Sequence, residues 1–292
     1  MLINFVRGFC MAIADSVPGV SGGTIAFLLG FYDKFIGSIN NILSGTKEQR
    51  RNSLKFILKL GIGWIIGFLL SVLILSSFFQ SNIYQISSLF LGLIIFSIPI
   101  IVMAEKDCLK GKYANLIFTA IGIIIVCLIT YYNPVSGEGS SIDLTNISLP
   151  LTLYVFIAAI ITISAMVLPG ISGSTLLLAM GLYLPMIMAI KEVFHLNMEY
   201  LPMLLVFAVG LVAGIFSVIK IVKYFLDKHR SQTVYLIIGL MIGSTYAIVM
   251  GATTLEVPQP AMTLQTFHVL FFILGGVILL GLELMKRRMV SE

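Results

Sequence analysis

Long apolar stretches recur along the chain and are separated by short polar segments. Six of them hold about 20 mostly apolar residues, the length that a helix needs to cross the hydrocarbon core of a bilayer. They cover residues 56–79, 85–104, 113–132, 201–219, 233–250 and 265–285. Because backbone polar groups must be satisfied inside lipid, runs of this length favour helices over open strands. The pattern therefore predicts an all-α protein that crosses the membrane several times.

Two further apolar stretches, residues 2–37 and 149–190, are each interrupted near the middle by proline and several glycines. We expect each to form a re-entrant helical hairpin, whose two limbs dip into the membrane and return to the same side. The alternative is two ordinary spans joined by a tight turn. Both arrangements bring the chain back to its starting side, so sidedness does not separate them.

Composition and charge agree with a polytopic membrane protein. Hydrophobic residues make up 59% of the chain and charged residues 11%, against about 45–50% and 25% in soluble domains, and the mean hydropathy is +1.06. These values exclude a cytosolic enzyme, a nucleic-acid-binding protein and a secreted domain. With the N-terminus inside, all of the 18 Lys and Arg residues except Lys191 fall on the cytoplasmic side, as the positive-inside rule requires. We therefore expect both termini in the cytoplasm.

The two interrupted stretches share a motif. Residues 14–24 read ADSVPGVSGGT and residues 165–175 read AMVLPGISGST, and the alignment pairs Pro18 with Pro169, an offset of 151 residues. Residues 1–146 and 147–292 then each hold one hairpin and three spans. Since three is odd, the second half must be inverted, with the first hairpin entering from the cytoplasm and the second from outside. Inverted repeats with broken helices that meet near the midplane are typical of secondary transporters.

The hairpin tips are suited to bind an anion. The first N–H groups of each returning limb lack helical partners and carry the positive end of the helix dipole, and nearby hydroxyls add donors, so two facing tips could hold a phosphate. The candidate phosphate-binding residues are Arg7, Ser21, Gly22, Gly23, Thr24, Ser172, Gly173, Ser174 and Thr175, and Pro18, Gly19, Pro169 and Gly170 would shape the tips. Alternatively, the hydroxyls only cap the limbs and the glycines only permit close packing.

Charged residues within the apolar stretches are functional candidates. Arg7 could bind phosphate, pair with Asp15 or extend to the lipid headgroups. Asp15 stands where the second repeat has Met166, and it could carry a coupling proton or cap the tip. Glu105 is a second candidate for proton coupling, although its position at the end of a span also fits an interfacial role.

Catalytic chemistry has little support in the sequence. The three cysteines, Cys10, Cys108 and Cys127, are far apart, and the three histidines do not cluster at metal-ligand spacing. A lipid phosphatase would need a nucleophile and base or a set of metal ligands. We therefore expect a transporter without a cofactor or metal rather than an enzyme.

The segments ADSVPGVSGGTIAFLLGFY and MVLPGISGSTLLLAMGLY resemble the polyprenyl-phosphate transporters of the PopT type, and the resemblance covers essentially the whole chain. It implies translocation of undecaprenyl phosphate across the bacterial plasma membrane, which returns the lipid carrier to the cytoplasmic leaflet for synthesis of peptidoglycan and other cell-wall polymers. It also implies a headgroup site formed by Asp15, Pro18, Gly19, Ser21, Gly22, Gly23, Thr24, Pro169, Gly170, Ser172, Gly173 and Ser174.

Three other functions remain as alternatives. A transporter of a small soluble anion would use the same tip chemistry, a membrane lipid phosphatase would need the catalytic groups described above, and a scaffolding protein would leave the paired broken helices unexplained. The expected partners are a polyprenyl-phosphate lipid and membrane lipids, and no nucleic acid. Assembly into a homo-oligomer stays open.

Overall fold

The computed structural model describes residues 2–15, 21–70, 82–131, 142–145, 147–170, 173, 176–177, 180–254 and 258–290. These ranges are helical with short connections and contain no strand. The helices are α1 (Leu2–Asp15), α2 (Gly22–Leu28), α3 (Tyr32–Ser44), α4 (Lys47–Leu70), α6 (Ile83–Ala104), α7 (Lys106–Leu109), α8 (Leu116–Tyr131), α9 (Leu149–Val167), α11 (Tyr183–Phe194), α12 (Leu201–Lys228), α13 (Arg230–Met250) and α14 (Val269–Val290). Three 3₁₀ turns are η2 (Tyr113–Asn115), η3 (Met198–Tyr200) and η4 (Gly251–Thr254).

Among the described residues, five helical segments are long and apolar enough to cross a membrane, so the chain is a polytopic membrane protein. They are Ile83–Ala104, Tyr113–Tyr131, Leu149–Val167, Met198–Lys228 and Arg230–Thr253. Four match predicted spans, although the helix predicted over 201–219 continues to Lys228. The fifth is the first limb of the predicted second hairpin. The predicted span 56–79 falls on α4, which is described only to Leu70, and α14 begins four residues after the start of the predicted span 265–285.

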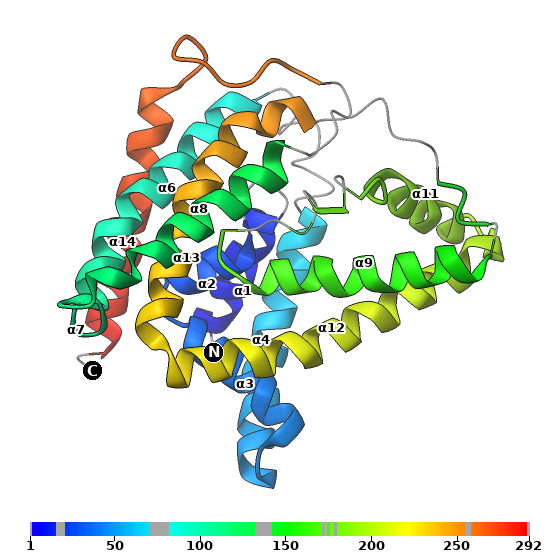
Figure 1. Ribbon diagram of the computed structural model, residues 1–292, viewed down its shortest axis with the longest axis horizontal. Coiled ribbons are helices and arrows are strands. Elements are labelled where there is room, and N and C mark those ends of the chain that lie inside the picture. Colours follow the sequence, from blue (N-terminus) through cyan, green and yellow to red (C-terminus); the bar gives the residue numbers. More distant parts are fainter. Residues whose placement is uncertain are drawn as a thin grey trace.

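Helices α6, α8, α13 and α14 lie side by side, with α8 against α13 and α14 against α6 (Figure 1). Glycines set the close approach in both pairs. A Cβ added to Gly92 of α6 would overlap the carbonyl oxygen of Phe272 in α14, and one added to Gly239 of α13 would overlap that of Thr119 in α8. Such contacts let helix backbones pack without intervening side chains, as is common in membranes.

The remaining long helices also form two pairs, α1 with α4 and α9 with α12, and the second pair extends sideways toward α11 (Figure 1). Glycines again lie at both contacts. A Cβ on Gly63 of α4 would overlap the Phe5 carbonyl of α1, and one on Gly214 of α12 would overlap the Ile163 side chain of α9. Gly63 and Gly214 are 151 residues apart, like the paired tip motifs.

Two short breaks have the same geometry. Gly30, between α2 and α3, and Gly181, before α11, both have φ of +66°, a left-handed conformation that favours glycine. The following N–H groups bond back five residues, from Phe31 to the Ala26 oxygen and from Leu182 to the Leu177 oxygen. This is the pattern of a Schellman helix end. Each break turns the chain into a further helix.

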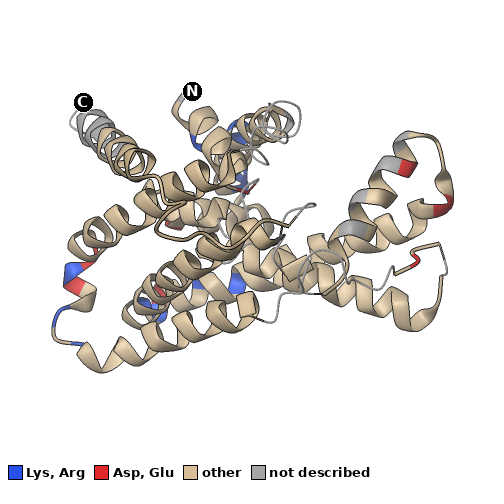
Figure 2. Cartoon of the chain, turned by 90° about the horizontal axis from the view of Figure 1, so that it is seen from above, with Lys and Arg blue, Asp and Glu red and all other residues tan. Residues whose placement is uncertain are grey.

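Charged side chains are distributed unevenly over the molecule. Figure 2 shows Lys and Arg in the left-hand and central parts of the view, which also hold both chain ends, whereas the far right-hand end carries Asp and Glu. The main core belongs to the part of the molecule that carries the Lys and Arg residues. There, buried side chains such as Tyr32, Ile94 and Met241 join α3, α6 and α13.

Candidate functional site

The first interruption lies between α1, which ends at Asp15, and α2, which begins at Gly22. Ser21 caps α2: its backbone is extended, with φ −131° and ψ 149°, and its Oγ accepts the N–H of Thr24 at 3.3 Å. Asp15 Oδ1 accepts the N–H of Gly22 at 2.6 Å, and Asp15 Oδ2 accepts the indole N–H of Trp64 at 2.9 Å. The carboxylate of Asp15 therefore lies at the positive end of α2.

This arrangement uses donors that the sequence predicts to be free for a ligand. The N–H groups of Gly22 and Thr24 are taken by a carboxylate and a hydroxyl of the chain itself, which fits the capping role left open above. Ser21 and Thr24 are almost fully buried, at 0% and 1% exposed. An anion could reach the Gly22 N–H only after Asp15 moved away.

The segment around α2 contacts the end of α9 directly. Thr24 Oγ1 accepts the N–H of Gly170 at 2.8 Å, and the Tyr32 hydroxyl donates to the Val167 carbonyl oxygen at 3.0 Å. A Cβ on Gly23 would lie 2.9 Å from that same Val167 oxygen. The start of α2 and the end of α9, 146 residues apart at the Thr24–Gly170 contact, are thus packed against each other inside the protein.

The second interruption follows α9, which Ser148 caps at its other end. Gly170 has φ of +91° and lies against α13, where an added Cβ would be 2.5 Å from the backbone of Leu240. Gly173 is buried, and a Cβ there would be 2.5 Å from Cγ of Met166. Met166 thus lies beside Gly173 as Asp15 lies beside Gly22, but it brings no charge.

Two polar side chains near the tips are absent from the sequence-based candidates. Trp64 donates to Asp15, and Thr162, one turn before Met166, is 3% exposed. Thr162 Oγ1 is buried, and within the described part of the chain it has no hydrogen-bond partner. A buried hydroxyl without a partner is costly and calls for an explanation. The sequence offers one clue to Thr162, a polar residue on the apolar limb before the second motif. Comparison of the two repeats does not reveal it, because the residue at the matching position, Met11, is apolar.

Of the other predicted site residues, only some are described. Pro18, Gly19, Ser172, Ser174 and Thr175 lie outside the described residues, whereas Pro169 is described and buried. Arg7 is two turns from Asp15 along α1 and has no described bond to it. Its Nη1 donates to Asn4 Oδ1 at 3.2 Å, and its Cζ lies 4.7 Å from the ring centre of Phe31.

Glu105 lies at the end of α6 in an ion pair that joins three elements. Arg230, the first residue of α13, donates to both oxygens of Glu105 at 2.9 and 2.6 Å, and to Asp33 of α3 at 2.9 Å. Burial alone would raise the pKa of Glu105, but the hydrogen bonds and charge of Arg230 outweigh it, and the pKa lies below its usual value. A carboxylate held ionised in this way is better suited to linking helices at the membrane interface than to transferring a proton.

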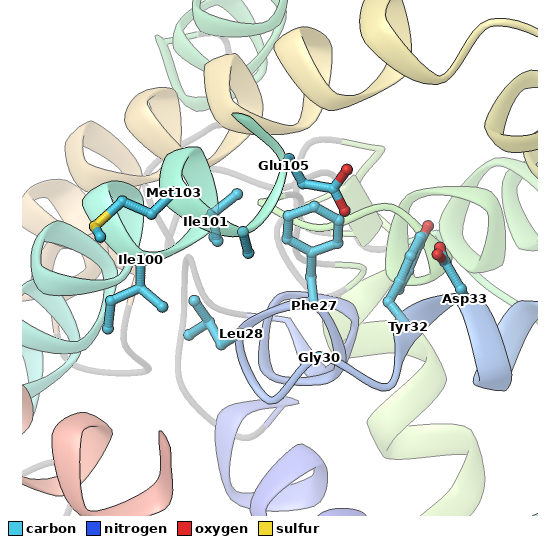
Figure 3. Close-up of a pocket in the computed structure, with 10 residues that line it drawn as sticks. Phe27, Leu28, Gly30, Tyr32, Asp33, Ile100, Ile101, Met103 and Glu105 are labelled. Carbon is cyan, nitrogen blue, oxygen red and sulfur yellow. The ribbon is translucent and has the colours of Figure 1, made fainter. Parts of the chain in front are cut away.

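A cavity of about 400 Å³ lies between the end of α2 and the end of α6. Figure 3 shows Leu28, Ile100 and Met103 on one side of it and the carboxylates of Glu105 and Asp33 on the other. Its apolar wall suits hydrocarbon, while the carboxylates along its edge disfavour an anion. Among the described residues, no group of three or more His, Cys, Asp or Glu side chains is arranged to hold a metal ion.

In this apolar protein, residues that follow the first motif proline contact residues beside the second, at Thr24 and Gly170, and paired broken helices of this kind are typical of membrane transporters. Irregular backbone persists at membrane depth only where protein buries it or where it lines a cavity. The fold and the site thus define a polytopic membrane protein of the transporter class.

Comparison with known proteins identifies the family. The chain belongs to the undecaprenyl phosphate translocase-like family, whose model matches residues 11–266. A polyprenyl-phosphate transporter of Staphylococcus aureus is 38% identical over 258 residues, which cover 86% of this chain and 87% of that protein. A polyprenyl-phosphate transporter of Vibrio cholerae is 33% identical over 253 residues, covering 83% and 76%. No solved structure gives a significant match.

Proposed function

We propose that this protein translocates undecaprenyl phosphate across the bacterial plasma membrane and returns the carrier to the cytoplasmic leaflet, where cell-wall polymer synthesis reuses it. Its membership of the translocase-like family and the names of its two relatives support this substrate. The observation that carries the location of the site is the direct contact between the two motif segments at Thr24 and Gly170. The phosphate would be held where these segments meet.

The two tips would bind phosphate differently. At the first, the carboxylate of Asp15 occupies the anion position on Gly22 N–H, so phosphate must displace it or meet it in its neutral form. At the second, Met166 leaves that position without a charge, and the unpaired hydroxyl of Thr162 is available as a donor to a phosphate oxygen. Phosphate would therefore bind first at the second tip.

The proposal includes an inverted repeat of residues 1–146 and 147–292. Its support is the matching of contacts: Gly92 with Phe272 corresponds to Gly239 with Thr119, and the pairing of α1 with α4 corresponds to that of α9 with α12. The 19 residues of α9 extend about 28 Å, close to a hydrocarbon core of about 30 Å. This length fits a full span as well as a limb of a re-entrant hairpin.

The proposed orientation has both termini in the cytoplasm. The separation of Lys and Arg from the acidic far end supports it, because basic residues near span ends are retained inside. The first tip would then open from the cytoplasm and the second from outside. The apolar wall between α2 and α6 offers a surface for the first isoprene units of the tail, which must stay in contact with lipid.

Proteoliposomes that carry labelled undecaprenyl phosphate test the function. Exposure of the headgroup to a membrane-impermeant reagent is followed from one leaflet, with the wild-type protein, with Thr162→Val and with Arg7→Ala. Thr162→Val keeps the side-chain shape and removes only the hydroxyl, and we expect it to slow translocation about tenfold while the fold is kept. We expect Arg7→Ala to weaken binding.

Wild-type protein that leaves the headgroup in its original leaflet, even with an imposed pH gradient or membrane potential, would refute lipid translocation. Uptake of radiolabelled inorganic phosphate would then favour a carrier of a small soluble anion. Translocation that is unchanged in Thr162→Val would remove that hydroxyl from the site without affecting the proposed substrate.

A further inference from the structure

A second cavity, separate from the hairpin tips, lies between the start of α1, α3 and the first half of α4. Its volume is about 450 Å³, and its walls carry three lysines, Lys34, Lys55 and Lys59, and three asparagines, Asn4, Asn41 and Asn52. The hydroxyl-bearing residues Ser38 and Ser53 line it as well. None of the residues that line the cavity is acidic.

The three ammonium groups have no counter-ion among the residues that the structure describes. Within the described ranges, none of the three lysines takes part in an ion pair or a side-chain hydrogen bond; Lys34 lies only over the ring of Phe56, with Nζ 5.0 Å from its centre. Like charges gathered in a concave site repel one another and focus a positive potential. The cavity is therefore built to receive negative charge from outside the chain.

The neutral groups favour phosphate over a carboxylate as the source of that charge. Asparagine amides and serine hydroxyls supply additional N–H and O–H donors around the lysines. A phosphate monoester offers three strong acceptor oxygens and a charge of about −1.5 to −2 at pH 7, so it can bond several of these donors at once. Lysine is an established partner for phosphate as a point charge.

Helix α1 connects this cavity to the tips. Asn4 lines the cavity, and it accepts a hydrogen bond from Arg7, one turn further along the helix. Asp15, at the first tip, is 11 residues beyond Asn4, about 16 Å along a helix axis. Arg7 thus lies between the two places and could contact a phosphate moving from one to the other.

We propose that the cavity lined by Lys34, Lys55 and Lys59 binds a phosphate monoester, as a second phosphate site at the end of the pathway where the N-terminus lies. This inference rests on the proposed function, under which the ligand is the headgroup of the translocated lipid after it leaves the tips. Free inorganic phosphate has the same chemistry and is the other source. In the proposed orientation the site faces the cytoplasm and receives the carrier.

Lysine protection tests the site in the unaltered full-length protein. The protein in lipid nanodiscs is reductively methylated with formaldehyde and dimethylamine–borane, both neutral reagents, the borane reducing the imine, and each lysine is quantified by mass spectrometry. Farnesyl phosphate should slow methylation of Lys34, Lys55 and Lys59 at least threefold relative to Lys47, an exposed lysine of α4 outside the cavity. Farnesol, which lacks the phosphate, should protect none of them.

A second experiment, with inorganic phosphate in place of farnesyl phosphate, identifies the source of the bound phosphate group. Inorganic phosphate at the same concentration should protect much less than farnesyl phosphate if the site takes a lipid headgroup, and equally if it takes free phosphate; either result supports a phosphate site. Equal protection of Lys47 and the cavity lysines would mean that general surface charge attracts the ligand, and it would overturn the proposal. Absence of protection would overturn it as well.

A matched pair of variants links the site to transport. Asn52→Asp adds one negative charge inside the cavity, and Gln49→Glu adds one on the same helix outside it, where a glutamate can still accept the N–H of Thr46. Asn52→Asp should abolish protection and slow headgroup translocation several-fold, and Gln49→Glu should change neither. If the wild-type protein translocates the headgroup and both variants do so at the same rate as each other, the second site is refuted and the proposed function stands. If the wild-type protein does not translocate the headgroup, the proposed function is refuted.

Discussion

Replacing Asp15 by asparagine should make the protein bind a lipid phosphate more tightly. In the structure this carboxylate accepts the N–H of Gly22 at 2.6 Å and that of Trp64 at 2.9 Å, so it fills the position at the start of α2 that an anion would take. Asparagine has nearly the same shape and retains one oxygen acceptor, but it carries no charge. The substitution therefore removes the competing anion and keeps one of the two hydrogen bonds, while the amide NH2 group faces the other donor.

The size of the effect follows from the geometry. A phosphate oxygen bonded to Gly22 N–H would come within about 4 Å of the carboxylate, where two unit charges interact by about 4 kcal/mol at an effective dielectric constant of 20. Asp15 can turn aside and screening reduces the interaction further, so we expect about 1.4 kcal/mol, or tenfold in affinity. Against this, the lost charge-assisted bond should lower the free energy of unfolding by about 1.5 kcal/mol.

The assay can use an intrinsic probe, because Trp64 is the single tryptophan of the chain and bonds to Asp15. Titration of farnesyl phosphate into purified wild-type protein and Asp15→Asn, followed by tryptophan fluorescence, gives both affinities. Farnesol serves as the control for the apolar part of the ligand. Equal or weaker binding by Asp15→Asn would refute the idea that this carboxylate competes with phosphate.

Two further predictions concern packing and pH. Gly92→Ala and Gly239→Ala should each lower the free energy of unfolding by about 1–3 kcal/mol, because the new Cβ overlaps a backbone oxygen of the facing helix. Gly61 faces open space, so Gly61→Ala should be neutral or stabilising by about 1 kcal/mol. Thermal unfolding followed by circular dichroism measures all three variants. A neutral Gly92→Ala would contradict the helix pairing. Glu105→Gln should destabilise the protein by about 1–2 kcal/mol at pH 7, a value reduced because Arg230 is 40% exposed. Since folding lowers the pKa of Glu105, this stabilisation is present above the unfolded value of about 4.3 and is lost as the pH falls through the lower pKa of the folded state. A difference between the two proteins that does not shrink on acidification would refute the reasoning.

The membrane-spanning helices were largely predictable from the sequence. Apolar runs such as 85–104 and 233–250 lie within a few residues of the observed helices, because length and hydropathy alone decide what can span lipid. Helix ends were less predictable. The helix predicted over 201–219 continues to Lys228, because its last turns are amphipathic and extend past the apolar run.

The contact between the two motif segments, which we propose as the phosphate site, was predictable from the sequence, but its bonding was not. Repeated proline and glycine identify both tips, and glycine at 170 is required by its positive φ and by the backbone of α13. The sequence does not reveal that Asp15 folds back onto Gly22 or that Trp64, 49 residues away, fixes its second oxygen. These contacts depend on the packing of α4 against α1, which no local pattern encodes.

The difference between the two tips predicts unequal affinities for the proposed substrate. A fully symmetric pair would hold phosphate equally at both. Here Asp15 lies beside Gly22 and its counterpart Met166 lies beside Gly173, so one motif has a built-in anion at this position and the other has none. Under the proposed function, Asp15 would rebind the Gly22 N–H as phosphate leaves the first tip, so that donor would not remain unpaired. Release from the first tip would therefore cost less than release from the second, and phosphate would be held more weakly at the first tip.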